Sequence, residues 1–168
     1  MKHILEERTL RLLRGAEGLR RYAYDDATGE QVHAPKGNLT IGVGVNLDVG
    51  LDEYEIDMLE RHRLHVGMTI FEHEVSTLVF ESSSIVFDLL PDGAQVALAM
   101  MVFQLGPEGV MEFHQMLRAI SGGYWLNAAQ EALNSKWTKE TPKRAHQVAA
   151  LLRSCRETDH SEDKPAAG

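Results

Sequence analysis

The chain has 168 residues, of which 43% are hydrophobic and 25% charged, and this composition is typical of an ordinary globular domain. Its formal net charge is −8, which argues against a nucleic-acid partner because nonspecific nucleic-acid binding depends on clustered lysine and arginine. No apolar run approaches the roughly 18 residues of a membrane-spanning helix, so no stable membrane insertion is expected, and the single cysteine excludes an intramolecular disulfide.

The N-terminal part of the chain predicts one helix followed by a small antiparallel sheet. Residues 3–14 carry apolar side chains at helical spacing and are too charged for the apolar core of a signal peptide. Residues 20–24 are typical of a strand, 25–37 are rich in turn-forming residues, and 38–45 predict the return strand. We therefore expect the protein to be made and folded in a cytoplasm.

The rest of the chain predicts helices. Asp52 can cap a first helix, and a second helix is expected after Gly67, over about 69–82. Residues 93–105 are apolar on nearly all sides, which predicts a buried central helix. Three further helices and a frayed tail are expected in this order: helices over 110–120, 125–133 and 142–153, and the tail over 157–168.

Three polar residues surround the predicted hairpin. Glu17 follows the first helix, Asp26 begins the loop, and Thr40 lies in the return strand. Hydrolysis of a glycosidic bond needs such a set, with one carboxylic acid and one carboxylate facing a sugar-binding cleft. A chain with 25 acidic residues offers many pairs of this kind, so spacing alone leaves solvated loop acids as the alternative.

The residues around this set resemble a known family. Its pattern is a Glu, eight residues, an Asp, a variable loop, and a Thr that opens a T-I-G-x-G strand. This chain has Glu17-Gly-Leu-Arg, then Tyr24 and Asp26, then the segment LTIGVG at 39–44, with the same first spacing. These residues resemble the phage-type lysozymes of glycoside hydrolase family 24, whose type member is the T-even bacteriophage lysozyme.

A second block of the chain resembles the same family independently. Its segments follow at matching spacing: MVFQLG at 101–106, SKW at 135–137 and TPKRA at 141–145. The resemblance covers about 10–153, with a poor match at 52–92. Two separate segments match the family in the same order along the chain, which chance similarity does not explain.

The resemblance implies roles for individual residues. Glu17 matches the general acid, and Asp26 and Thr40 match the residues that position and activate the attacking water. Four further positions match residues of the substrate-binding cleft, the last of them an arginine that pairs with the catalytic glutamate: Phe103, Gln104, Trp137 and Arg144.

The fold implied by the resemblance is α+β and mostly helical. A small mixed lobe with the catalytic β-hairpin is expected over 15–66. A larger helical lobe is expected to combine 1–14 with 67–156, followed by a disordered tail over 157–168.

The activity implied is that of an endolysin, a muramidase that hydrolyses the β-1,4 bond between N-acetylmuramic acid and N-acetylglucosamine in bacterial peptidoglycan and so causes host cell lysis. The expected enzyme is a monomer and needs no metal or cofactor. A holin is expected to release it from the host cytoplasm to the cell wall and periplasm by permeabilising the membrane.

Two other functions stay open at this point. A lytic transglycosylase would release an anhydro sugar without water, and the presence of both Asp26 and Thr40 favours hydrolysis instead. A wall-binding or virion module would have lost catalysis, whereas Glu17 and Asp26 are both present. Two departures concern substrate fit: Val45 and Met100 stand where the type member has a histidine and an asparagine.

Overall fold

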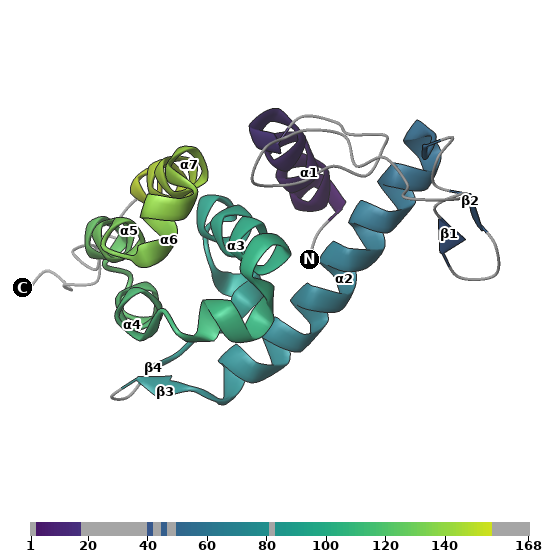
Figure 1. Cartoon of the computed structure of the whole chain (residues 1–168). Coiled ribbons are helices and arrows are strands. Elements are labelled where there is room, and N and C mark those ends of the chain that lie inside the picture. The colour runs from purple at the N-terminus through teal and green to yellow at the C-terminus, as the bar shows by residue number, and fades with distance from the viewer. Residues whose placement is uncertain (1–2, 18–39, 42–44, 47–49, 81–82, 156–168) are drawn as a thin grey trace, which may run out of the picture.

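The computed structural model describes residues 3–17, 40–41, 45–46, 50–80 and 83–155, and most of them are helical (Figure 1). The helices are α1 (His3–Glu17), α2 (Glu53–Thr77), α3 (Asp92–Met111), α4 (His114–Ser121), α5 (Trp125–Leu133), α6 (Lys136–Glu140) and α7 (Pro142–Arg153). The short strands are β1 (Thr40–Ile41), β2 (Val45–Asn46), β3 (Val79–Phe80) and β4 (Ser83–Ser84), and a 3₁₀ turn spans Phe87–Leu89.

The central helix of the fold is α3. Its residues from Ala94 to Val102 are all buried, which confirms the prediction of a helix that is apolar on nearly all sides. On one side α3 packs against α1 and α2, and on the other side against α7, which in turn packs against α5 (Figure 1). The apolar stripe of α1 contributes Leu5, Leu10 and Leu13 to this core, as the spacing predicted.

The long helix α2 corrects the sequence prediction, which placed a break near Gly67. The predicted cap is correct, because the Asp52 carboxylate accepts from the Glu55 amide at 2.8 Å and the Glu55 carboxylate accepts from the Asp52 amide at 2.9 Å. From this cap the helix runs unbroken for 25 residues. A single glycine costs a helix about 1 kcal/mol and does not end it when packing supports both sides. The predicted lobe boundary at 66/67 therefore falls inside one helix, and the lobe division itself stays a prediction.

Two other predicted helices differ from those observed. The helix expected over 69–82 ends at Thr77, and β3 and β4 form a short antiparallel pair in place of its last turn. The helix expected over 110–120 is interrupted, because the end of α3 and the start of α4 are separate helical segments. In contrast, α5 and α7 lie where they were predicted, and α6 was not predicted.

The described strands of the N-terminal part form a pair of their own. β1 and β2 are antiparallel, with Thr40 opposite Asn46 and Ile41 opposite Val45. The prediction of one return strand over 38–45 is therefore wrong, because the chain reverses direction between Ile41 and Val45. The partner strand expected over 20–24 lies outside the described residues, as does the tail over 157–168.

In the described part of the chain, no single helix combines the length and apolarity needed to cross a membrane, and α3 with α4 meets that test only as a pair across a 98° bend.

Candidate active site

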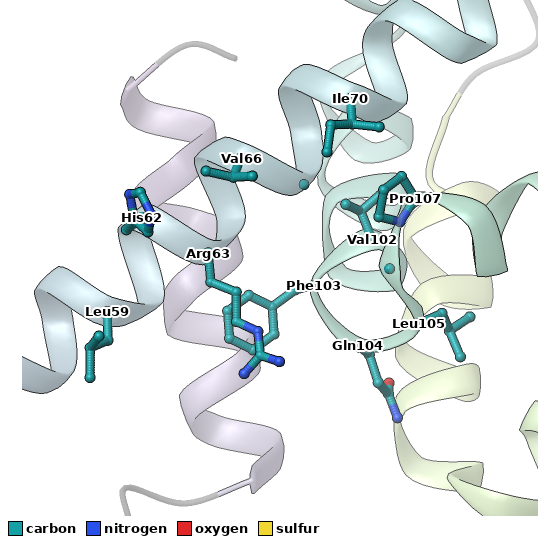
Figure 2. A pocket seen from close by; sticks show the side chains of 12 residues that line it. Leu59, His62, Arg63, Val66, Ile70, Val102, Phe103, Gln104, Leu105 and Pro107 are labelled. Carbon is teal, nitrogen blue, oxygen red and sulfur yellow. The ribbon is translucent and has the colours of Figure 1, made fainter. Parts of the chain in front are cut away.

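A pocket of about 770 Å³ lies between α2 and the C-terminal half of α3 (Figure 2). The wall from α2 carries exposed apolar side chains together with His62 and Arg63. The opposite wall comes from 102–107. All twelve lining residues belong to these two walls: Leu59, His62, Arg63, Val66, Gly67, Ile70, Val102, Phe103, Gln104, Leu105, Gly106 and Pro107.

Two glycines shape this pocket. Gly106 has a φ of 74°, a left-handed conformation that favours glycine, and it bends α3 directly before Pro107. Gly67 lies where α2 comes close to α3, since a Cβ at this position would stand 2.9 Å from Cγ1 of Val102. The bend and the close approach together bring the end of α3 beside α2.

Phe103 and Gln104, two predicted substrate-binding residues, both line this pocket and are both half-buried. The side-chain oxygen Oε1 of Gln104 is buried and accepts no hydrogen bond from the described residues. An unsatisfied buried acceptor costs about 1–3 kcal/mol, so a donor on a bound ligand would be stabilising there. An aromatic ring beside an amide suits a ligand with an apolar face and N–H or O–H groups, which is the chemistry of an acetylated amino sugar.

Trp137, the third predicted substrate-binding residue, lies elsewhere. It is buried in α6, and its ring meets the Phe113 ring edge-on with centroids 6.1 Å apart. It lines a second pocket of about 450 Å³, which α4, α5 and α6 help to form. Its indole Nε1 is buried and donates to no acceptor among the described residues. The structure therefore separates Trp137 from the pocket of Phe103 and Gln104.

Arg144 lies in the first turn of α7 and is half-buried. Burial lowers the pKa of its guanidinium, because taking a cation out of water disfavours the charged form. The neighbouring residue, Lys143, donates from Nζ to the backbone carbonyl of Gly15 at 3.4 Å. This contact joins the first turn of α7 to the last turn of α1, which ends at Glu17.

The three predicted catalytic residues are placed unequally. Glu17 is the last residue of α1 and Thr40 is in β1, but their side chains lie outside the described structure. Asp26 lies outside the described residues altogether. Thr40 lies in a strand, as predicted, whereas the first helix does not end at residue 14 and instead runs on to include Glu17.

The end of α1 is also fastened to α2 by ion pairs. Arg14 donates to Asp57 at 2.6 Å and to Glu60 at 2.7 Å, and Arg61 donates to Asp57 at 2.6 Å. Arg61 also reaches two carboxylates near the start of α1 at 3.0 and 2.6 Å, those of Glu6 and Glu7. These six residues, which we call the α1–α2 ion-pair network, fix the helix that carries Glu17 against the helix that lines the pocket.

Comparison with known proteins decides the family. The chain is 31% identical over 153 residues to a probable T4-type lysozyme 2 of Dictyostelium discoideum, covering 77% of this chain and 89% of that protein. The chain belongs to the T4-type lysozyme family. It is also 33% identical over 88 residues to a probable T4-type lysozyme 1 of the same organism, covering 49% of this chain and 52% of that protein. No protein-family model matches.

A virion protein shares the similarity as well. The chain is 30% identical over 89 residues to the pre-baseplate central spike protein Gp5 of Enterobacteria phage T4, covering half of this chain and 16% of that protein. The match therefore takes in only a small part of Gp5, whereas it takes in most of the Dictyostelium lysozyme 2. The mostly helical, lysozyme-like fold expected from the sequence is confirmed by this membership and by the helices described above.

For this T4-type lysozyme family member, sequence reasoning missed the contribution of α2 to the pocket. Arg63 drew no attention, because a single arginine on a long polar helix is ordinary. The sequence pattern that could have indicated the pocket is the three apolar residues at helical spacing around Arg63: Leu59, Val66 and Ile70. All three are exposed in the structure.

Proposed function

We propose that this protein is a muramidase that hydrolyses the β-1,4 bond between N-acetylmuramic acid and N-acetylglucosamine in bacterial peptidoglycan, and that it acts as an endolysin. Membership of the T4-type lysozyme family supports this activity. The observation that carries it is the 3.4 Å contact of Lys143 with Gly15, because it joins the helix that ends at Glu17 to the helix turn that holds Arg144. We propose that the carboxyl group of Glu17 meets the half-buried Arg144 guanidinium at this junction.

In the proposed mechanism Glu17 is the general acid. A glycosidic oxygen leaves readily only if it is protonated as its bond breaks, so the acid must hold its proton until that moment. Asp26 acts as the base on a water molecule that Thr40 helps to hold, and this water attacks from the opposite face of the sugar. This division of roles inverts the configuration at the anomeric carbon.

In this mechanism Arg144 orients the Glu17 side chain, but its positive charge also favours the deprotonated form of Glu17, which cannot act as the acid. A nearby cation favours the carboxylate, whereas partial removal from water favours the carboxylic acid. We propose that Phe103 and Gln104 bind the glycan beside this junction, with the sugar ring on the aromatic face and an N–H or O–H group donating to Oε1 of Gln104.

The first experiment is Glu17→Gln, measured as the initial rate on purified peptidoglycan. Gln keeps the size of the side chain but cannot donate the proton, so we expect a loss of at least about 10²–10⁴-fold with circular dichroism unchanged. Glu53→Gln is the matched control, because Glu53 is exposed in the first turn of α2. A folded Glu17→Gln variant that keeps more than about a tenth of the wild-type rate contradicts the assignment.

The products decide between the alternatives. Mass spectrometry of a complete digest should give reducing ends that have gained the mass of water. Anhydro ends would identify a lytic transglycosylase instead. Binding to peptidoglycan without any new end would identify a wall-binding or virion module.

We also propose that the protein is a monomer, is made in the host cytoplasm, and reaches the wall after a holin permeabilises the membrane. Expression in bacteria should leave cells intact until the membrane is permeabilised chemically. Rapid lysis without permeabilisation contradicts this proposal.

A further inference from the structure

Arg63 brings a positive charge to the pocket between α2 and α3. Its side chain extends from α2 toward the side of the pocket where Phe103 and Gln104 lie (Figure 2). Among the twelve described residues that line it there is no aspartate or glutamate, although the whole chain has 25 acidic residues and a net charge of −8. The described lining therefore carries the positive charge of Arg63 and no carboxylate, so this wall suits an anion.

The other arginine of α2 shows what Arg63 does differently. Arg61 faces α1 and donates to three carboxylates, those of Glu6, Glu7 and Asp57, at 2.6 to 3.0 Å. Arg63 is two residues further along the helix and therefore points to another side. It is exposed and forms no ion pair with any residue that the structure describes. Its guanidinium can thus offer a bidentate donor pair to a ligand.

The rest of the pocket limits the ligand to an amphipathic one. Leu59, Val66 and Ile70 are 56%, 43% and 43% exposed, so three apolar side chains line the wall around Arg63. The opposite wall presents the Phe103 ring and the Gln104 amide. A ligand that satisfies both walls has apolar faces, amide or hydroxyl donors, and a carboxylate.

We propose that Arg63 determines substrate specificity by binding a carboxylate of the wall polymer, and this inference rests on the proposed function. Peptidoglycan carries carboxylates in two places, on the lactyl group of the muramic acid when its peptide is removed and on the stem peptide when it is present. Polymers of N-acetylglucosamine alone carry none. Arg63 therefore selects the anionic wall glycan over neutral glycans of the same backbone.

The first test compares Arg63→Gln with wild type on peptidoglycan that keeps its stem peptides. We expect KM to rise about tenfold, as for the loss of one charge-assisted hydrogen-bonded contact, with kcat changed less than about twofold. Arg63→Lys should recover part of the loss, because it keeps the charge but not the bidentate geometry. Arg153→Gln, which removes the same charge from an exposed site at the end of α7, should leave KM unchanged.

The second test measures binding without turnover, by calorimetry with soluble fragments. Three fragments are used: a disaccharide with its stem peptide, the same disaccharide with a free lactyl carboxylate, and an N-acetylglucosamine oligomer. Wild type should bind one or both anionic fragments about tenfold more tightly than Arg63→Gln does, and the fragment affected identifies the carboxylate. The two proteins should bind the neutral oligomer equally.

These outcomes separate the two proposals. If wild type hydrolyses peptidoglycan but Arg63→Gln has the same KM, or loses affinity equally for the neutral oligomer, the role of Arg63 is overturned while the muramidase proposal stands. If wild type binds the anionic fragments through Arg63 but hydrolyses nothing, the muramidase proposal fails and the role of Arg63 stands. If wild type binds none of the fragments, the role of Arg63 is overturned.

Discussion

At the scale of single residues, the pocket depends on two positions that have no side chain. Gly106 lets α3 bend before Pro107, and Gly67 lets α2 approach Val102. From the sequence alone, both glycines indicate only possible helix ends, because glycine is common where helices end. Only Gly106 ends a regular helical run, because only there does the backbone adopt a positive φ.

We predict that Gly67→Ala destabilises the protein although alanine is the better helix former. The new Cβ would lie 2.9 Å from Cγ1 of Val102, which is 2% exposed and β-branched, so either this stiff side chain or the helix must shift. Overpacking costs about 1–3 kcal/mol, and the gain in helix propensity of about 1 kcal/mol offsets part of it. Chemical denaturation should therefore show a net loss of about 1 kcal/mol in the free energy of unfolding.

Gly15→Ala is the matched control for this prediction. Gly15 also lies in a helix, but a Cβ there would meet no atom of the described residues within 4 Å. This substitution should leave stability unchanged or raise it by up to about 1 kcal/mol. If the two substitutions change the free energy of unfolding equally, the close contact of Gly67 with Val102 does not limit stability, and the prediction is wrong.

At the scale of elements, the α1–α2 ion-pair network sets how two helices lie together. Hydrogen bonds from Arg61, and then from Arg14, hold the pKa of the Asp57 carboxyl below its usual range. The hydrogen bond to Glu60 raises the pKa of Arg14 most, and the hydrogen bond to Asp57 raises the pKa of Arg61 most. Since the network ties the start of α2 to the helix that carries Glu17, it contributes to the geometry of the proposed active site as well as to stability.

We predict that the contribution of Asp57 to stability disappears in acid. Its pKa is lower in the folded protein than in the unfolded chain, where it is about 3.9, so its stabilisation is complete above that value and is lost as the pH falls through the folded pKa. Asp57→Asn should cost about 1 kcal/mol at neutral pH, as partly exposed pairs do, and progressively less below about pH 4. The measurement is the free energy of unfolding of both proteins between about pH 2 and 7.

Added salt provides the control for that measurement. Because the network is partly exposed, salt should reduce the cost of Asp57→Asn at neutral pH. A cost that is independent of both pH and salt would mean that Asp57 acts through packing and not through its charge.

At the scale of the whole molecule, the net charge of −8 conflicts with binding to an anionic wall. Local cations must compensate, and the structure distributes the described ones over several sites: Arg63 in the first pocket, Lys136 beside the second pocket, Arg118 on α4, and Lys143 and Arg144 at the start of α7. Long-range repulsion and short-range attraction then act together, and they respond differently to salt.

We predict that moderate salt raises the rate on peptidoglycan or leaves it unchanged. Screening weakens the repulsion beyond a Debye length of about 8–10 Å, whereas a contact inside a pocket is screened much less. The measurement is the initial rate as ionic strength rises from low to physiological. A steep fall over that range would mean that long-range attraction, and not repulsion, governs the approach to the wall.

The sequence by itself determined the family, the proposed catalytic residues and most of the helices. Helical spacing of apolar residues located α1, α3, α5 and α7, because burying one face of a helix requires that spacing whatever its partner is. The motif around Glu17, Asp26 and Thr40 identified the family through residue types that the chemistry needs, and these do not depend on how the helices pack.

Where the intrinsic preference of a segment for helix or strand is weak, its conformation depends on tertiary packing. A glycine changes helix stability by only about 1 kcal/mol. Packing against α3 could therefore keep α2 helical across Gly67, whereas α3 bends at Gly106. The pairing of β1 with β2, in place of one return strand, is also a tertiary outcome, because which strands pair does not follow from the residue pattern of a single segment. The pocket follows from this packing. Arg63 and Phe103 are 40 positions apart in the sequence, and both line the pocket because α2 comes close to α3 at Gly67.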